Sequence, residues 1–281
     1  MSAEKLPKRI WILWFQGKEN MPEVVKSCYA SWQHHNPDWE VNLLDGSNYD
    51  KYVDVKEIFE NRETEIPVEK RSNIIRVNLL KKYGGVWVDA TCYCIKPLDN
   101  WLPQCATSGF FAFSRPTRDK MIDNWFLASY KDNYLMRRLC DNENKFWINN
   151  PSINPLNKYL RFHYWFPHLL SFFHIKPYIW HSLILRFFYK YHYFRFHYQF
   201  EELYNTDQEF KRVWDETSKV LADLPIRLHS YGIHKRLNSK IKREIDNQIA
   251  PLYKLTWKLG DRSFDENSIY TYLLSKNRSN M

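Results

Sequence analysis

The residues best placed to do chemistry end the apolar part of the run YGGVWVDATCYCIKPLD, from Tyr83 to Asp99. One carboxylate, Asp89, closes this apolar stretch, and a hydroxyl, Thr91, stands two residues on, where a second acid is absent. Ligands of open α/β sheets gather at the carboxyl ends of the strands, so a carboxylate there can hold a cation or a ligand. A carboxylate at a strand end also serves as a turn or cap residue.

The residues before Asp89 predict the elements that position it. Residues 68–83 carry apolar side chains on one helical face, which indicates a helix. Lys81 and Lys82 fall in its last turn, where the helix dipole favours cations, and the pair Gly84-Gly85 is a stop signal. The short apolar run that follows is typical of a buried strand. Asp89 is therefore predicted at the ligand-binding edge of a sheet.

The rest of the chain favours the same α/β class. Residues 9–15 form an apolar run typical of a strand, residues 22–35 a helix, and residues 39–46 an alternating strand, which together predict a βαβ unit. Later segments predict a strand over 108–114, a helical or mixed segment over 119–139, and an amphipathic helix over 206–221. The Asn-Pro-rich residues 148–155 are the one predicted linker.

Composition narrows the class of protein. The chain has 281 residues, of which 44% are hydrophobic and 26% charged, as expected for a globular protein. Its five cysteines form no C-x-x-C pair and favour a reducing compartment. The first residues include an early acid and only a short apolar run, unlike a signal peptide. We expect a cytoplasmic protein.

Residues 145–200 form an unusual basic and aromatic segment. From Asn144 to Phe200 there is no Asp or Glu, seven Lys and Arg side chains contribute +7, and twenty aromatic residues occur. Charged residues and prolines interrupt it too often for a membrane span. Three interpretations stay open: contact with a membrane surface, a helical lobe whose rings are simply core, and a nucleic-acid surface. Nucleic acid is the weakest, since no recognised binding module accompanies the segment.

Several common catalytic motifs are absent from the sequence. It has no G-x-G-x-x-G, no P-loop, no G-x-S-x-G elbow and no H-E-x-x-H helix. A helix, two glycines, an apolar strand and then Asp is instead the arrangement by which nucleotide-sugar glycosyltransferases present a carboxylate to a metal. Of the other acids, Asp45, Asp99 and Asp123 are candidates for positioning an acceptor.

At these residues the sequence resembles bacterial capsular polysaccharide synthesis glycosyltransferases, which are related to glycosyltransferase family 32. The matching segments are LPKRIWILWFQG (Leu6 to Gly17), SWQHHNPDWEVNLLD (Ser31 to Asp45), RSNIIRVNLLKKYGGVWVDAT (Arg71 to Thr91), NWFLAS (Asn124 to Ser129) and YKLTWK (Tyr253 to Lys258). The resemblance implies a GT-A-like, Rossmann-type nucleotide-sugar-binding sheet flanked by helices, with a UDP-sugar donor and Mn²⁺ or Mg²⁺. It also implies that the anomeric configuration is retained.

The resemblance also implies roles for particular residues. Catalytic roles fall to Asp89, Lys254 and Lys258. Donor-binding roles fall to Trp14, Gly17, Arg71, Asn73, Arg76, Gly85, Asp89 and Thr91. Acceptor-binding roles fall to Trp125, Ser129 and His197. The implied metal ligand is Asp89, with His229 or His234 as a candidate partner because Tyr253 stands where the family has a histidine.

Two further positions depart from the family pattern. Asn73 replaces an acid, and Thr91 offers a neutral hydroxyl, which is a poor ligand for a hard cation beside a carboxylate. These departures motivate an alternative function. The chain would then be a sugar-nucleotide or lipid-diphosphate binding protein of the same fold with weakened catalysis.

The resulting hypothesis is a retaining glycosyltransferase. It would move a hexose from a UDP-sugar to a lipid-linked oligosaccharide during bacterial capsule or surface polysaccharide synthesis, with no nucleic-acid partner. Residues 1–150 would form the nucleotide-sugar-binding core, 151–205 the basic aromatic lobe, and 206–281 a C-terminal part that returns to the donor site. Contact through residues 145–200 would place the enzyme on the inner face of the cell membrane.

Overall fold

The structure is a computed structural model that describes residues 5–155, 169, 172, 176–259 and 263–278. At its centre lies a five-stranded sheet with the order β2-β1-β3-β6-β5. These strands are β1 (Arg9–Leu13), β2 (Glu40–Leu44), β3 (Gly85–Val88), β5 (Phe110–Ser114) and β6 (Ile122–Ser129). β1 pairs in parallel with both β2 and β3, whereas β6 is antiparallel to β3 and β5. The predicted α/β class and the βαβ unit are confirmed.

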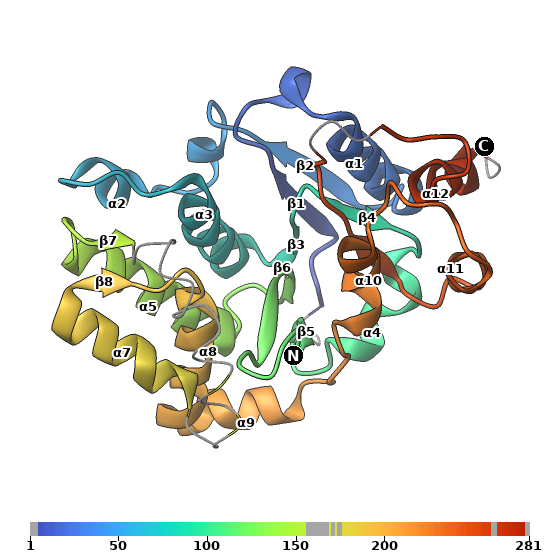
Figure 1. The fold of residues 1–281 in the computed structure, drawn as a ribbon. Coiled ribbons are helices and arrows are strands. Elements are labelled where there is room, and N and C mark those ends of the chain that lie inside the picture. The colour runs from blue at the N-terminus through green and yellow to red at the C-terminus, as the bar shows by residue number, and fades with distance from the viewer. Residues whose placement is uncertain (1–4, 156–168, 170–171, 173–175, 260–262, 279–281) are drawn as a thin grey trace.

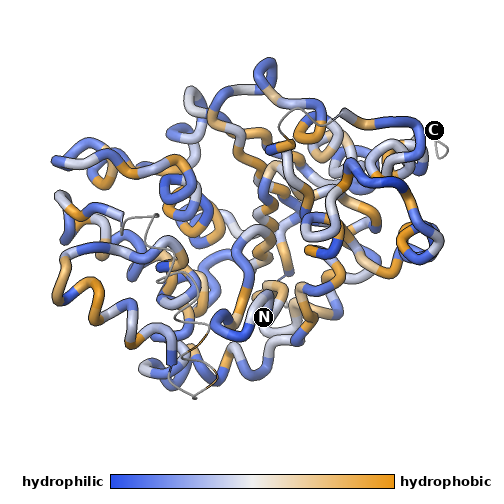
Figure 2. Tube along the Cα trace, in the orientation of Figure 1, coloured by the Kyte–Doolittle hydropathy of each residue, from blue (hydrophilic) through white to orange (hydrophobic). Residues whose placement is uncertain are grey.

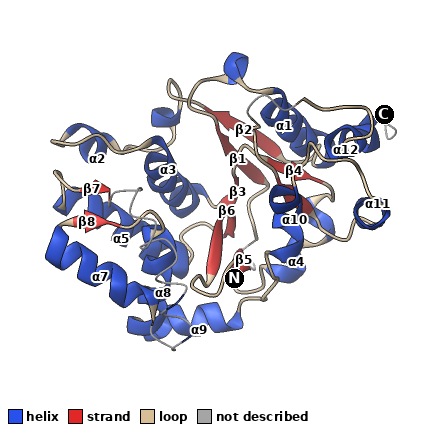
Figure 3. Cartoon of the chain, viewed as in Figure 1, coloured by secondary structure: helices blue, strands red, loops and turns tan. Residues whose placement is uncertain are grey.

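Helices cover both faces of this sheet (Figures 1 and 3). One side carries α3 (Val68–Tyr83), α5 (Tyr134–Asn149), α8 (Arg195–Thr206) and α9 (Gln208–Glu216), with α2 (Lys56–Glu60) and α7 (Pro177–Phe188) further out. The other side carries α1 (Glu23–His35), α4 (Leu102–Cys105), α10 (Asp223–Tyr231), α11 (Ser239–Asp246) and α12 (Ile269–Arg278). The fold is thus a three-layer α/β/α arrangement.

Shorter elements complete the described chain. A two-stranded antiparallel sheet joins β4 (Cys92–Cys94) to β9 (Leu252–Lys254), and a parallel one joins β7 (Asn154–Pro155) to β8 (Lys190–Tyr191). Single turns of 3₁₀-helix are η1 (Lys18–Asn20), η2 (Tyr49–Lys51) and η3 (Leu98–Asn100). The β4–β9 pairing matters most, because it brings the C-terminal part of the chain next to the residues that follow β3.

Alternation along the central strands fills a core on each face. In β1, Trp11 packs in the core on the α3 side, whereas Ile10 and Ile12 pack in the core on the α1 side. In β3, Trp87 faces the α3 side, and its neighbours Val86 and Val88 face the other. Successive strand residues point to opposite faces, so the residue two after Trp87 points to the α3 side as well.

The two glycines after α3 end the helix as predicted. Gly84 has φ +67° and its N–H donates to the Leu80 carbonyl at 2.9 Å. Gly85 has φ +93°, and a Cβ there would lie 2.6 Å from the Arg9 carbonyl oxygen on β1. Glycine is required because only it adopts such angles freely and leaves room for that close approach.

Two predicted segments differ from the structure. The mixed segment at 119–139 contains strand β6, whose apolar run is buried between β3 and β5, so periodicity alone could not identify it. The helix predicted over 206–221 is instead the last residue of α8 and then α9, which ends at Glu216 because Thr217 is extended.

The predicted linker at 148–155 packs against the core. Ile153 is buried there, and the Arg62 guanidinium donates to the carbonyls of Trp147 at 2.7 Å and Asn150 at 2.9 Å. That same core contains residues on both sides of the predicted boundaries at 150 and 205, including Phe200 and Phe210. The division into 1–150, 151–205 and 206–281 stays a prediction, and residues 156–168 lie outside the described chain.

Candidate functional site

Asp89 immediately follows β3 and lies on the α3 side of the sheet. Its N–H donates to the Trp125 carbonyl at 2.8 Å, which extends the pairing of β3 with β6 by one residue. Its own carbonyl accepts the Cys92 N–H at 2.9 Å, which turns the chain into β4. The Trp87 indole N–H donates to Asp89 Oδ1 at 3.1 Å, as the strand alternation requires. The carboxylate therefore stands fixed at the carboxyl end of a parallel strand.

Two cations bind this carboxylate, one on each oxygen. Arg76 Nη2, from the middle of α3, lies 3.1 Å from Asp89 Oδ1, and Lys254 Nζ, from β9, lies 2.7 Å from Asp89 Oδ2. The Arg76 guanidinium also stacks 4.8 Å from the centre of the Trp87 ring and donates to the Asn124 carbonyl. We call Arg76, Asp89 and Lys254 the Asp89 cluster. Its formal charge is +1, because one carboxylate meets two cations.

The protonation states of the Asp89 cluster follow from its surroundings. Burial opposes ionisation of Asp89, but Lys254 and Arg76 outweigh it and lower the pKa of Asp89 to about 2. Burial acts against the charge of Lys254, yet the Asp89 carboxylate raises the pKa of Lys254 overall. The Asp89 side chain keeps 27% of its surface exposed. A charged, partly accessible cluster results.

The Asp89 cluster lines a cavity of about 300 Å³. Helix α3 supplies Lys70 and Asn73 to the wall, and the β5–β6 connection and β6 supply Lys120 and Asp123. The residues between β8 and α8, together with α8 itself, close it with Tyr193, Phe194, Phe196 and His197. The cavity thus joins the carboxyl edge of the sheet to the basic aromatic segment.

Sequence reasoning missed two of the cavity's cations. Lys70 is 5% exposed; burial lowers its pKa to about 8, and its ammonium donates to the Tyr193 carbonyl and lies 4.2 Å from the centre of that ring. Lys120 lies 3.5 Å from the centre of the Phe194 ring, and burial lowers its pKa. A signal for Lys70 was present, because Lys70, Asn73 and Arg76 recur at three-residue steps along one face of α3.

Further polar and aromatic groups complete the cavity. The Asn124 amide donates to Asn73 Oδ1 at 3.1 Å, so the predicted donor residue Asn73 is held in place by another amide. His197 Nε2 lies 3.7 Å from Asp123 Oδ1, and burial lowers the pKa of His197. Trp125 stacks against Phe113 with ring centres 5.0 Å apart and also lines the cavity. Asp123 and His197 thus line the same cavity as the Asp89 cluster.

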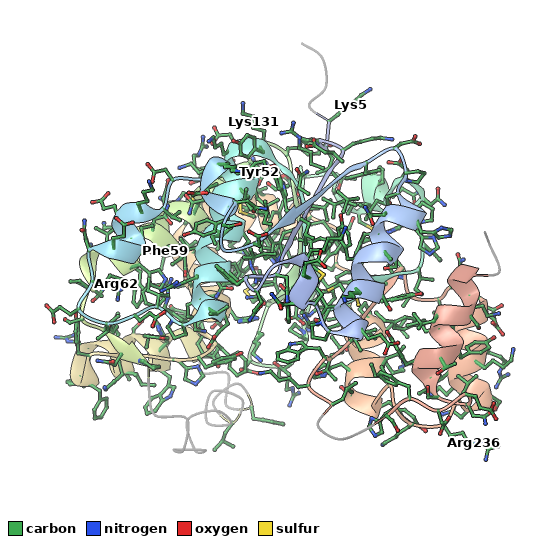
Figure 4. All side chains as sticks on the ribbon, turned by 90° about the horizontal axis from the view of Figure 1, so that it is seen from above. Lys5, Tyr52, Phe59, Arg62, Lys131 and Arg236 are labelled. Carbon is green, nitrogen blue, oxygen red and sulfur yellow. The ribbon has the colours of Figure 1, made fainter. Side chains whose placement is uncertain are left out.

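Some predicted donor and acceptor residues lie elsewhere. Arg71 points away from the cavity wall: it pairs with Glu65 at 2.8 Å and lies 5.5 Å from the Phe59 ring centre. Figure 4 shows Phe59 on the same side of the molecule as Arg62, in the α2 region. Gly85 and Ser129 pair with each other at the opposite end of β3 from Asp89. Gly85 and Asp89 are four residues apart, which corresponds to about 13 Å along an extended strand.

A second predicted group gathers after β1. Trp14 packs edge-on against Trp257 with ring centres 5.6 Å apart, and Gly17, at φ +82°, lies in the turn that follows. Lys258 is exposed beside Trp257. These residues do not line the 300 Å³ cavity. Trp14 and Trp257 lie at the same edge of the sheet as this cavity, because Trp14 follows β1 and Trp257 comes three residues after Lys254.

The remaining candidates have structural contacts. Thr91 is buried, and its carbonyl accepts the Leu255 N–H at 2.8 Å, which holds β9 beside β4. Asp45 accepts hydrogen bonds from Ser47 at 2.7 and 2.8 Å. Asp99 pairs with Lys8 at 2.7 Å. Of the three acids considered for an acceptor, Asp123 is the one that lines the cavity.

The residues present do not make a metal site of their own. Both Asp89 oxygens bind cations. His229 lies in the last turn of α10 with much of its surface exposed, and partial desolvation of its ring together with the Lys254 charge lowers its pKa. Throughout the described ranges, no group of three or more His, Cys, Asp or Glu side chains could hold a metal ion. A hard divalent cation needs more oxygen ligands than this. Mn²⁺ or Mg²⁺ stays a prediction from the resemblance.

Comparison with known proteins decides the family. Residues 1–186 match the family model described as capsular polysaccharide synthesis protein. The chain belongs to this family. The match includes Lys70, Arg76 and Asp89, whereas Lys254 lies beyond it. The predicted family is thereby confirmed, while bacterial origin and a relation to family 32 stay predictions.

Curated relatives of this family member are fungal. The chain is 28% identical over 171 residues to the O-glycosyltransferase braB of Annulohypoxylon truncatum, a match that covers 54% of this chain and 40% of that protein. It is 26% identical over 170 residues to the O-glycosyltransferase PaGT of Phomopsis amygdali, covering 54% and 42% respectively. The match therefore spans about two fifths of the length of these relatives.

One solved structure, the PaToxG glycosyltransferase, aligns with 87% of this chain and 85% of its own at 15% identity and a TM-score of 0.41. That likeness is too low to define the fold. The α/β assignment rests on the strands and their pairing.

Proposed function

We propose that this member of the capsular polysaccharide synthesis family is a retaining glycosyltransferase with a GT-A-like fold. It moves a hexose from a UDP-sugar to a lipid-linked oligosaccharide during bacterial capsule or surface polysaccharide synthesis. The observation that carries the proposal is the Asp89 cluster, a carboxylate bound by Arg76 and Lys254 at the carboxyl edge of the sheet, facing a cavity of about 300 Å³. Relatives named as glycosyltransferases support the same class of activity.

The Asp89 cluster suits the leaving group of such a transfer. When the bond from the sugar C1 to the diphosphate breaks, negative charge collects on the diphosphate oxygens. Lys254 and Arg76 are charged and fixed in place before the substrate arrives, so they stabilise that charge without reorganising. Asp89 holds both cations in position and keeps them from repelling each other.

The Trp14–Trp257 pair suits the base of the nucleotide. Both rings lie at the same edge of the sheet as Asp89, and Trp257 is 42% exposed. An exposed aromatic face stacks well against a uracil ring, and Gly17 lets backbone approach the ribose closely. This assignment places the predicted donor residues Trp14 and Gly17 on the nucleoside and Arg76 on the diphosphate.

The aromatic part of the cavity wall suits the acceptor. Tyr193 and Phe194 offer rings to a saccharide, and Asp123 offers a carboxylate to an acceptor hydroxyl. In a retaining transfer the hydroxyl attacks C1 from the side that the diphosphate leaves. The new bond forms between that oxygen and C1, and the hydroxyl proton passes to the departing phosphate. No protein base is required for these steps.

The test is release of UDP by the purified protein from a panel of UDP-sugars, with and without a lipid-linked saccharide. We expect release with at least one donor, faster with acceptor, and retained configuration in the product. Because the described residues form no metal site, release is measured with Mn²⁺, Mg²⁺ and EDTA. Loss of release in EDTA that Mn²⁺ restores would support the metal predicted from the resemblance.

The second candidate is a binding protein with weakened catalysis. The amide at Asn73, hydrogen bonded to Asn124 where the family pattern has an acid, is the observation that favours it. Calorimetric titration with the same UDP-sugars distinguishes the two functions. Binding that depends on Asp89, together with no UDP release from any donor, would support this candidate and overturn the enzyme.

A further inference from the structure

Helix α7 exposes an apolar stripe on the outside of the molecule. Ile179, Leu183 and Phe187 are spaced by four residues and therefore lie on one face, with 42%, 41% and 70% of their surfaces exposed. Phe188, at the helix end, is 65% exposed. The inner face of α7 carries the buried residues Pro177, His181 and Ile184. Helix α7 thus carries apolar side chains on both its packed face and its open face.

The exposed apolar stripe of α7 differs in burial from the aromatic residues of α8, which belong to the same basic aromatic segment. Helix α8 buries Phe196 and Phe200 in the core beside the central sheet. Helix α7 lies outside α8 at the rim of the molecule, and Figure 2 colours stretches along it as hydrophobic. Of the two helices described within residues 145–200 after residue 175, α8 uses its aromatic side chains as core, whereas the outer face of α7 does not. Exposed large apolar side chains that gather in this way mark an interaction surface.

Positive charge surrounds the stripe. Arg186 lies exposed on α7 between the apolar residues, Lys190 follows the helix, and Lys145 is exposed on the adjoining helix α5. No acid occurs in the sequence from 144 to 200. Two acids of α8 lie beside α7. Glu201 accepts the Tyr178 N–H at 3.0 Å, and burial raises the pKa of Glu201 to about 7. Glu202 lines a cavity together with His181 of α7, and burial raises the pKa of Glu202. They lie behind α7, on its packed side.

We propose that the outer face of α7, formed by Ile179, Leu183, Arg186, Phe187 and Phe188, docks on an anionic lipid bilayer. An apolar stripe flanked by arginine and lysine matches an interface in which acyl chains meet anionic headgroups. A second copy of this chain would bring like charges together and is disfavoured for that reason. None of the described helices is long and apolar enough to cross a membrane. On this proposal α7 lies along the bilayer surface.

Docking through α7 would also orient the cavity. Strand β8 leads directly from α7 to Tyr193 and Phe194, which line the cavity beside the Asp89 cluster. The proposed acceptor residues Tyr193 and Phe194 therefore follow the docking face closely in the sequence. The purpose of that orientation rests on the proposed function, because a lipid-linked acceptor would reach the cavity from the bilayer. Docking itself does not depend on catalysis.

Flotation with lipid vesicles tests the proposal. The vesicles contain phosphatidylcholine alone or phosphatidylcholine and phosphatidylglycerol at three to one. We expect the protein to float with the anionic vesicles at low salt. Salt near 1 M, where the screening length falls to about 3 Å, should weaken that binding. Equal binding to both kinds of vesicle, or no binding to either, overturns the proposal.

A matched pair of variants locates the contact. The double variant Phe187→Glu and Phe188→Glu should reduce partitioning by about tenfold or more, because it replaces two apolar side chains by anions at the lipid surface. The control is Ile249→Glu, which should float as the parent does. Ile249 is 49% exposed and follows α11, a helix that lies on the opposite side of the molecule from α7 (Figure 1). Equal partitioning of the two variants would overturn the assignment to α7.

Two further readouts separate the alternatives. Sedimentation of the parent protein should show a monomer, and a dimer that the α7 variant abolishes would assign this face to a second copy instead. UDP release with a soluble acceptor analogue should be the same in the parent and the α7 variant. Flotation without any UDP release would contradict the proposed function while supporting docking, so the two failures are distinguishable.

Discussion

At the residue scale, the chemistry of this protein centres on how one carboxylate is held. Asp89 is bound through Oδ1 by Arg76 and Trp87 and through Oδ2 by Lys254, so each oxygen has a partner from a different element. Removing the carboxylate leaves Arg76 and Lys254, which are largely buried, without this counter-ion. An uncompensated buried charge is costly, and that cost should be visible both in stability and in activity.

Replacing Asp89 tests the cluster directly. Asp89→Asn should lower the free energy of unfolding by about 2 kcal/mol, because Arg76 and Lys254 lose their counter-ion. UDP release should fall by about 100-fold or more, because both cations move from the diphosphate position. The control is Asp141→Asn, whose partner Lys81 is bound at 2.7 Å in an exposed pair and whose loss should cost under about 1 kcal/mol. Equal losses in the two variants would contradict the role of Asp89.

The buried Lys70 makes a prediction about pH. Burial lowers its pKa to about 8 in the folded protein, against about 10.4 in the unfolded chain. Between these values the unfolded chain binds more protons than the folded one, so the contribution of Lys70 to stability rises with pH in this window and is unfavourable below it. The free energy of unfolding of the parent minus that of Lys70→Met should increase by about 2 kcal/mol from pH 7 to pH 10.

Denaturant unfolding at several pH values measures this difference. Lys240→Met serves as the reference, because Lys240 is exposed on α11. A flat difference between the parent and Lys70→Met would mean that Lys70 keeps its ordinary pKa in the folded protein.

At the element scale, the junction of α3 and β3 delivers the site. Helix α3 presents Lys70, Asn73 and Arg76 to the cavity, and the two glycines turn the chain so that β3 can pair with β1. The two glycines therefore help to position Asp89, although Gly85 begins β3 and Asp89 follows the other end of this strand. A change there should act through the position of β3.

Gly85→Ala tests that junction. The added Cβ would meet the Arg9 carbonyl at 2.6 Å with φ at +93°, so the variant should lose about 3 kcal/mol of stability and UDP release should fall with it. Gly46→Ala is the comparison, because its nearest contact would be 3.1 Å from the Phe15 carbonyl without a positive φ, and about 1 kcal/mol is expected. Thermal unfolding and UDP release are the measurements. A larger loss at Gly46 would contradict this account.

At the scale of the whole molecule, the site is assembled from distant parts of the chain. Lys254 lies 165 residues after Asp89 and outside the family match to residues 1–186. The β4–β9 pairing opposes Cys92 to Lys254, which fixes the lysine next to the carboxylate. The C-terminal part of the chain therefore belongs to the site that the matched part begins.

Two lysines four residues apart test this assembly. Lys254→Met should reduce UDP release by about 100-fold, because the cation on Asp89 Oδ2 is lost. Lys258→Met should change release by less than about tenfold, because Lys258 is exposed beside Trp257 and does not line the cavity. Initial rates at saturating donor, with stability checked by thermal unfolding, give the comparison. A larger loss of UDP release in Lys258→Met than in Lys254→Met would assign the catalytic role to Lys258, which the sequence resemblance also implies.

The sequence by itself determined the local elements around Asp89. Helix 68–83 was predicted with the bounds that α3 has, and so were the glycine stop and the strand that ends at the carboxylate. These features follow from helical periodicity, backbone angles available only to glycine, and the order of residues along the chain. Each of them is set by residues within one or two turns of one another.

Only the tertiary structure decided which side chains share the site. Arg71 and Arg76 point about 140° apart around α3 because they are five residues apart, but the sequence does not say which of them meets the carboxylate. The packing of α3 places Arg76 beside Asp89 and leaves Arg71 to pair with Glu65. Lys70, Lys120 and Lys254 converge from three separate elements, and α7 and α8 divide one aromatic segment between surface and core. Packing between elements far apart in the chain sets these relations, and local sequence patterns do not encode it.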